Sequence, residues 1–157
     1  MYEPQIGDYG VVKTGGFFGK LIRVGTISRW NHAFIYIGDG KIVGADPTGV
    51  AVSPLSNYPK VAWNKHEVLT QEQRIAIAEH ANQSVGRPYN FGIIFVLALR
   101  ALGVKIFPQK IINFLAKHNG YICSELVAEV YAQAGVSICE TPGLCNPGDL
   151  AERLIWQ

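Results

Sequence analysis

The fold of this chain is decided by the stretch NHAFIYIGDGKIV, residues 31–43. Residues 32–37 are rich in β-branched and aromatic side chains, residues 38–40 are Gly-Asp-Gly, and residues 41–43 are again mainly apolar. Two β-rich runs on either side of a glycine-bearing turn predict an antiparallel β-hairpin. The rest of the chain supplies further elements to cover it.

The length of the hairpin loop decides which side chains share a face. If residues 38–40 form the loop, with a bulge, His32 faces Asp46. If the loop has only two residues, Asp46 lies opposite Ala33, on the other face of the sheet. The sequence leaves both registers open, and the choice decides whether Asp46 can orient the His32 ring.

Helices and short strands are expected around the hairpin. Thr70 and Gln73 form a capping box that opens a helix running to about Val85. Residues 124–134 place apolar side chains on one helical face, and Gly135 follows where helices commonly end. Further strands are expected at 9–12, 50–52 and 65–69, and further helices at 17–24, 91–102 and 109–117. Because the strands gather towards the N-terminal side, the predicted fold class is α+β.

Composition narrows the class of protein. The 157 residues are 48% apolar and 17% charged, which excludes a disordered chain, and the length suits one domain spanning 1–157. Fourteen Lys and Arg against 12 Asp and Glu give a net charge of +2. This lacks the strongly basic character expected of a nucleic-acid-binding protein.

Targeting signals are not expected. The sequence opens without a basic segment followed by an apolar run, and the apolar stretch 91–99 is too short to span a bilayer. A cytoplasmic location is therefore expected, although a phage-encoded or otherwise exported protein would show the same pattern. The cysteines are Cys123, Cys139 and Cys145. Their odd number predicts no disulfide framework and at least one free thiol, and the last two lack companions at zinc-ligand spacing.

Cys123 and His32 are the residues that suggest chemistry. Cys123 opens the helix at 124–134, where unpaired N–H groups and the helix dipole are expected to lower a thiol pKa. His32 begins the best strand and can serve as general base for such a thiol. The alternative readings are structural: a free Cys often fills core space, and a strand-end His often bonds a carbonyl.

Residues 31–43 together with Tyr121-Ile122-Cys123-Ser124-Glu125-Leu126-Val127 resemble the permuted branch of the NlpC-type papain-like hydrolases, the YiiX-like group. The order of the motifs also matches, because His32 precedes Cys123 as in the circularly permuted members. Three shorter stretches, at 6–8, 86–89 and 146–150, support the likeness, whereas 91–119 contributes no motif.

The resemblance implies a papain-like fold in which a helix bearing the nucleophile packs on a small antiparallel sheet bearing the base. Cys123 and His32 match the nucleophile and the base. Tyr89 matches a tyrosine that lies beside the nucleophile and helps to stabilise the oxyanion, although a packing role is the alternative. Relatives carry His or Glu where this chain has Gly44. Asp46, two residues further on, is the expected substitute, although Asp-Pro-Thr-Gly is also good turn chemistry.

The function expected on this basis is a cysteine-dependent amidase or peptidase that forms an acyl-enzyme and requires no metal or cofactor. By resemblance, its substrates are cell-wall peptides or other small N-acyl or isopeptide bonds. One alternative is a lipid-directed acyl hydrolase or acyltransferase whose segment 91–99 contacts an acyl chain or membrane surface. The other is a catalytically silent binding module, suggested by Gly44. The sequence does not predict an oligomeric state.

Overall fold

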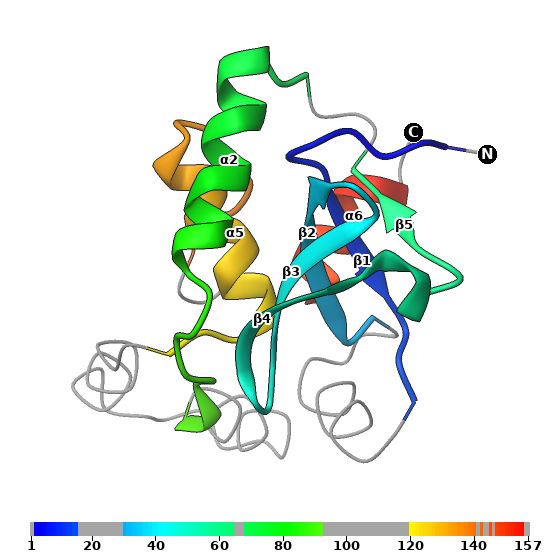
Figure 1. Cartoon of the computed structure of the whole chain (residues 1–157), viewed down its shortest axis with the longest axis vertical. Helices are drawn as coiled ribbons and strands as arrows, with labels where there is room; N and C mark the ends of the chain where they lie inside the picture. The colour runs from blue at the N-terminus through cyan, green and yellow to red at the C-terminus, as the bar shows by residue number, and fades with distance from the viewer. Residues whose placement is uncertain are drawn as a thin grey trace.

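The predicted hairpin forms the middle of a five-stranded antiparallel sheet (Figure 1). The computed structural model describes residues 2–15, 30–64, 68–92, 120–140, 142, 145 and 147–155. Its strands are β1 (Tyr9–Val12), β2 (His32–Gly38), β3 (Lys41–Asp46), β4 (Gly49–Pro54) and β5 (Ala62–Trp63). They lie in the order β4-β3-β2-β1-β5, so β2 is the central strand.

Three helices cover one face of this sheet. They are α2 (Gln71–Gln83), α5 (Cys123–Gln133) and α6 (Pro147–Ile155). α2 and α5 pack on each other and on β2, and α6 packs against β1 and β5 (Figure 1). The capping box predicted at Thr70 is present, with the Thr70 hydroxyl accepting from the Gln73 N–H at 3.2 Å. No described helix is long and apolar enough to cross a membrane.

Strand alternation divides the core into two clusters. The larger cluster lies between the sheet and the helices and includes Ala33 and Ile35 of β2. The smaller cluster lies on the opposite face and includes Phe34. The 3-10 turn η1 (Leu55–Asn57) and the residues after it cover this second face. Alternate residues of β2 therefore serve different cores, as a period of two requires.

The hairpin combines features of both predicted loops. Asp39 and Gly40 have φ values of 51° and 66° and form a two-residue turn, with Gly38 paired to Lys41. Of the two loops that the sequence left open, the two-residue loop is therefore the one present. A bulge between Tyr36 and Gly38 nevertheless shifts the register, and Phe34 pairs with Gly44. Continued to the end of the strands, this register sets His32 opposite Asp46, as the longer loop predicted.

Of the other predicted strands and helices, some are confirmed, one is wrong in part, and some lie outside the described residues. The strand expected at 50–52 is confirmed by β4, and the helix expected at 124–134 by α5. The strand expected at 65–69 is wrong at residues 68 and 69, which are not in a strand, and 65–67 lie outside the described residues. β5 comes a few residues earlier, at Ala62–Trp63. The helices expected at 17–24 and 109–117, and 91–102 beyond residue 92, also lie outside the described residues.

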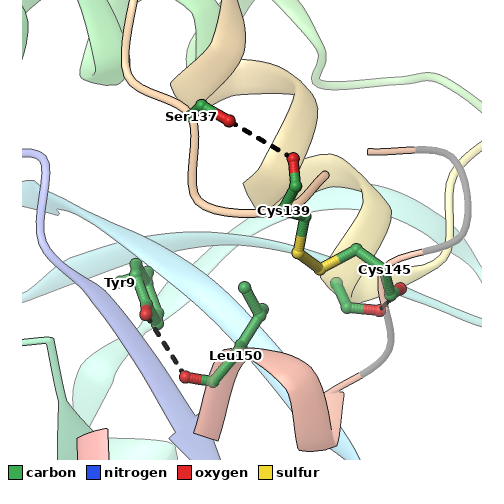
Figure 2. The surroundings of a disulfide bond; sticks show 6 residues. Tyr9, Ser137, Cys139, Cys145 and Leu150 are labelled. Atoms are coloured by element: carbon green, nitrogen blue, oxygen red, sulfur yellow. Dashed lines mark hydrogen bonds between the residues drawn. A yellow bond between two sulfur atoms is a disulfide. The ribbon is translucent and has the colours of Figure 1, made fainter. Parts of the chain in front are cut away.

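Cys139 and Cys145 form a disulfide bond, a correction to the prediction from the odd cysteine count that no disulfide framework would form. Figure 2 shows this bond joining the segment after α5 to the segment that leads into α6. Leu150 of α6 lies nearby, and its carbonyl accepts a hydrogen bond from the Tyr9 hydroxyl at 3.3 Å. The tertiary fold brings the two cysteines together, which their number alone does not reveal. Cys123 is free.

Candidate active site

Cys123 is the first residue of α5 and is 2% exposed. The residue before it, Ile122, is the N-cap, and its N–H donates to the Glu125 carboxylate at 3.3 Å. Backbone N–H groups of Ala33, Ser124 and Cys123 itself point to the sulfur. The start of α5 thus meets β2 at the residue that follows His32 in the chain.

Burial decides the ionisation of the Cys123 thiol. It raises the thiol pKa to about 11, although the three surrounding N–H groups lower it. The N–H groups at the helix start lower this pKa, as expected, but desolvation of the thiolate outweighs them and the net shift of the Cys123 pKa is upward. At neutral pH the thiol is protonated.

His32 is the first residue of β2 and is partly buried. Its ring lies on the Phe34 face of the strand, with ring centroids 6.0 Å apart, whereas Cys123 belongs to the cluster on the other face. Among the described residues, no hydrogen bond joins the ring to the Cys123 sulfur. Burial lowers the pKa of His32 to about 4, with the nearby Asp46 charge acting in the opposite direction. The resting pair is a neutral thiol and a neutral imidazole.

Gly44 leaves the room that the His32 ring occupies. A Cβ at position 44 would lie 3.4 Å from His32 Nε2 and 3.3 Å from the Cβ of Phe34. Phe34 pairs with Gly44 on one side and Gly10 on the other, and a Cβ at Gly10 would come within 2.8 Å of the Phe34 ring. Glycine at position 44 thus accommodates the bulk of Phe34 and His32 on the same face.

Asp46 ends β3 and lies near His32 without a hydrogen bond to it in the described structure. Its Oδ1 atom accepts from the Thr48 N–H at 2.8 Å and from the Thr48 hydroxyl at 2.5 Å. These contacts are those of an Asx turn. Asp46 therefore has the turn role that its sequence context suggested, and it acts on His32 through its charge.

Tyr89 lies near Cys123 because a parallel β-bridge pairs it with Tyr121. Tyr89 pairs with Tyr121, two residues before Cys123, through backbone bonds of 3.0 and 3.1 Å that flank the pair. Gly120 allows this approach, because a Cβ there would lie 2.9 Å from the Pro88 carbonyl oxygen. Burial raises the pKa of Tyr89, and the Cys123 and Asp46 charges raise it further. The Tyr89 hydroxyl therefore lies within electrostatic range of the nucleophile candidate.

Tyr58 belongs to the same group and was not predicted from the sequence. Its ring centroid lies 5.6 Å from that of His32 and 4.9 Å from that of Phe34. Burial raises the pKa of Tyr58, and the charges of Asp46 and Cys123 add to this effect. No sequence motif marks Tyr58, because it follows the irregular turn η1 and meets His32 only through the tertiary fold.

Ser124 ties the start of α5 to the disulfide. Its buried hydroxyl donates to the Cys145 carbonyl at 2.6 Å. Ser124, the residue next to Cys123, is therefore bonded to the segment around Cys145. The disulfide fixes that segment to Cys139. This support positions the sulfur against β2.

One end of the central strand thus gathers all four predicted site residues, Cys123, His32, Asp46 and Tyr89, together with Tyr58. The contacts do not join them into a hydrogen-bonded triad. Cys123 and Tyr89 approach from the helix side, whereas the His32 ring packs with Tyr58 on the other face of the sheet. The arrangement places a thiol, an imidazole, a carboxylate and two phenols around one strand end.

The architecture is an α+β fold in which a helix bearing a cysteine at its first residue packs on an antiparallel sheet bearing a histidine. This architecture resembles the crystal structure of metalloprotein YiiX from Escherichia coli O157:H7, DUF1105. The TM-score is 0.61 with 21% sequence identity, and the match covers 97% of this chain and 83% of that chain. No protein-family profile and no curated protein sequence matches this chain. The likeness establishes a YiiX-like fold.

Proposed function

We propose that this protein is a cysteine-dependent amidase or peptidase of the permuted NlpC type, with Cys123 as nucleophile and His32 as base. The observation that carries the proposal is that the Cys123 sulfur lies against the backbone N–H of Ala33, the residue next to His32. Acyl transfer through a thioester uses a thiol nucleophile activated by a neighbouring base, and this contact supports Cys123 and His32 in those roles.

In the acylation step the Cys123 sulfur bonds to the carbonyl carbon of an amide while its proton passes to His32. His32 then protonates the departing amine, and water hydrolyses the thioester to release an acid and restore the thiol. The N–H groups at the start of α5 and the Tyr89 hydroxyl support the oxyanion. Proton transfer requires the His32 ring to come within hydrogen-bond distance of the Cys123 sulfur.

The substrate class follows from the resemblance to NlpC-type enzymes. It is a cell-wall peptide or another small N-acyl or isopeptide bond. The YiiX structure is described as a metalloprotein. Within the described part of this chain, no three His, Cys, Asp or Glu side chains are grouped to hold a metal ion. These residues do not fit a metal site, and no step of the proposed reaction uses one.

A second candidate is a binding module without catalytic activity on the same fold. The separation of the His32 ring and the Cys123 sulfur onto two sides of β2 favours it, as do the two neutral resting forms. The two candidates predict different chemistry at Cys123, so one experiment separates them.

The experiment follows acetylation of Cys123 by p-nitrophenyl acetate, with release of nitrophenol recorded against pH and the labelled peptide identified by mass spectrometry. We expect a labelled Cys123 that turns over at pH 7 to 8. An unassisted thiol with a pKa of about 11 would react appreciably only in much more alkaline solution. The His32→Ala variant should lose the reaction at neutral pH and keep the alkaline one.

His80→Ala is the matched control, because His80 lies in α2 and outside the site. It should leave the rate unchanged. If wild type and His32→Ala acetylate at the same rate at every pH, the general-base role of His32 is wrong. If Cys123 of the folded protein is not labelled at all, the enzyme proposal is wrong and the binding module is the better account of the site.

A further inference from the structure

A pocket of ≈ 330 Å³ opens beside the His32 end of the sheet, on the face away from the helices. Its walls come from the end of β1 and the residues after it, and from the last residue of η1 and the segment that follows. The lining residues are Val12, Lys13, Thr14, Gly15, Asn57, Tyr58, Pro59 and Lys60. This volume lies at the small end of ligand pockets and suits a group about the size of one amino acid.

Two contacts connect the pocket to the candidate active site. Val12 is the β1 partner of His32 in the sheet register. Tyr58 forms a wall of the pocket, and its ring lies 5.6 Å from the His32 ring. The Tyr58 hydroxyl also lies within electrostatic range of Cys123. A group held in the pocket is therefore separated from the proposed base by a single aromatic ring.

The charge of the pocket is positive. Lys13 and Lys60 are exposed, and neither forms an ion pair with any residue that the structure describes. No lining residue is acidic. The sequence reinforces this, because neither 9–38 nor 47–65 contains an Asp or Glu. Asp46, at the end of β3, is a carboxylate outside the pocket whose charge raises the pKa of Tyr58.

We propose that this pocket is a subsite for an acidic group of the substrate, a carboxylate or a phosphate monoester, bound between Lys13 and Lys60. Two ammonium groups without an ion-pair partner among the described residues, beside a partly apolar wall, attract an anion, and the side chains of Thr14 and Asn57 offer polar groups. The proposal deepens the proposed amidase function by naming the class of its substrate, and it rests on that function for the reaction. Binding itself does not depend on the reaction.

The test is an NMR titration of the wild-type chain with three small ligands of similar size. They are N-acetyl-aspartate, its neutral counterpart N-acetyl-asparagine, and N-acetyl-O-phosphoserine. We expect the acidic ligands to shift the amide signals of residues 12–15 and 57–60 and the ring signals of His32 and Tyr58. Whichever acid binds more tightly identifies the source of the charge as carboxylate or phosphate. N-acetyl-asparagine should bind at least about tenfold more weakly.

Variants of the two lysines test whether their charges bind the acid. Lys13→Gln/Lys60→Gln should weaken binding of the acid by about tenfold or more. Lys41→Gln, which removes an exposed lysine at the turn end of the hairpin, should leave binding unchanged. Equal binding of the aspartate and asparagine ligands, or equal losses in the two kinds of variant, would overturn the proposal. Because binding is measured without turnover, a catalytically silent protein can still pass this test.

Discussion

At position 32 the environment favours the neutral imidazole. The His32 ring packs against the rings of Phe34 and Tyr58, and this burial lowers its pKa from 6.5 to about 4. Asp46 is near enough to favour the charged form, but its Oδ1 atom is engaged by Thr48. A neutral imidazole at physiological pH has a free lone pair to accept the proton of a thiol.

This depressed pKa predicts how stability depends on pH. The unfolded chain binds a proton at His32 near pH 6.5, whereas the folded chain does so only near pH 4. The stabilising contribution is therefore complete above pH 6.5 and is lost as the pH falls towards 4. The free energy of unfolding of the wild type should fall by on the order of 1–3 kcal/mol relative to His32→Gln over this window.

Urea denaturation of both proteins at several values between pH 7 and pH 4 measures this difference. His80→Gln is the control, since it removes a histidine from α2. Parallel pH profiles for the wild type and His32→Gln would contradict the burial of the ring.

At the scale of single elements, the hairpin shows how the register predicted for a three-residue loop arises from a two-residue turn. Asp39 and Gly40, both with positive φ, form the tight turn that a right-handed strand twist favours. The bulge between Tyr36 and Gly38 adds one residue on β2 and restores the facing of His32 and Asp46. The turn sequence predicts a hairpin reliably, but the bulge depends on how the strands pack.

The disulfide acts at the same scale, because it joins the segments flanking α5 and α6. Closing a short loop between Cys139 and Cys145 should contribute about 2 kcal/mol to the free energy of unfolding. We expect dithiothreitol to lower the melting temperature of the wild type but not that of Cys139→Ser/Cys145→Ser. Circular dichroism melts with and without the reductant measure this. An unchanged wild-type melt under confirmed reduction would show that the bond adds nothing to stability.

At the scale of the whole molecule, Tyr131 joins three distant parts of the chain. Its hydroxyl donates to the Gly7 carbonyl at 2.5 Å and accepts from the Asn64 side chain at 2.8 Å. Its ring packs edge to face on Tyr9, at 5.4 Å between centroids. Asn64 in turn accepts from the Tyr9 N–H. One phenol in α5 thus holds the N-terminal turn and the segment after β5.

Tyr131→Phe should lower the free energy of unfolding by about 1–3 kcal/mol, because it leaves buried polar groups at Gly7 and Asn64 without this partner. Tyr36→Phe is the matched control, since among the described residues the Tyr36 hydroxyl makes one hydrogen bond, an exposed contact of 3.2 Å from the Gly40 N–H. Loss of the Tyr36 hydroxyl should lower the free energy of unfolding by less than about 0.5 kcal/mol. Urea denaturation of the three proteins makes the comparison, and equal losses in both variants would refute the buried network.

The sequence by itself determined the hairpin, the capped helix α2, and the start and end of α5 to within a residue. It also singled out Cys123 and His32 as the candidate site residues. These features follow from short-range causes, namely side-chain periodicity, capping hydrogen bonds and glycine turns. Only the tertiary structure decided the partner of Cys139, the place of Tyr58 beside His32, and the raised pKa of Cys123. Each of these depends on burial and on contacts between distant segments, and no local pattern encodes how deeply a side chain is desolvated.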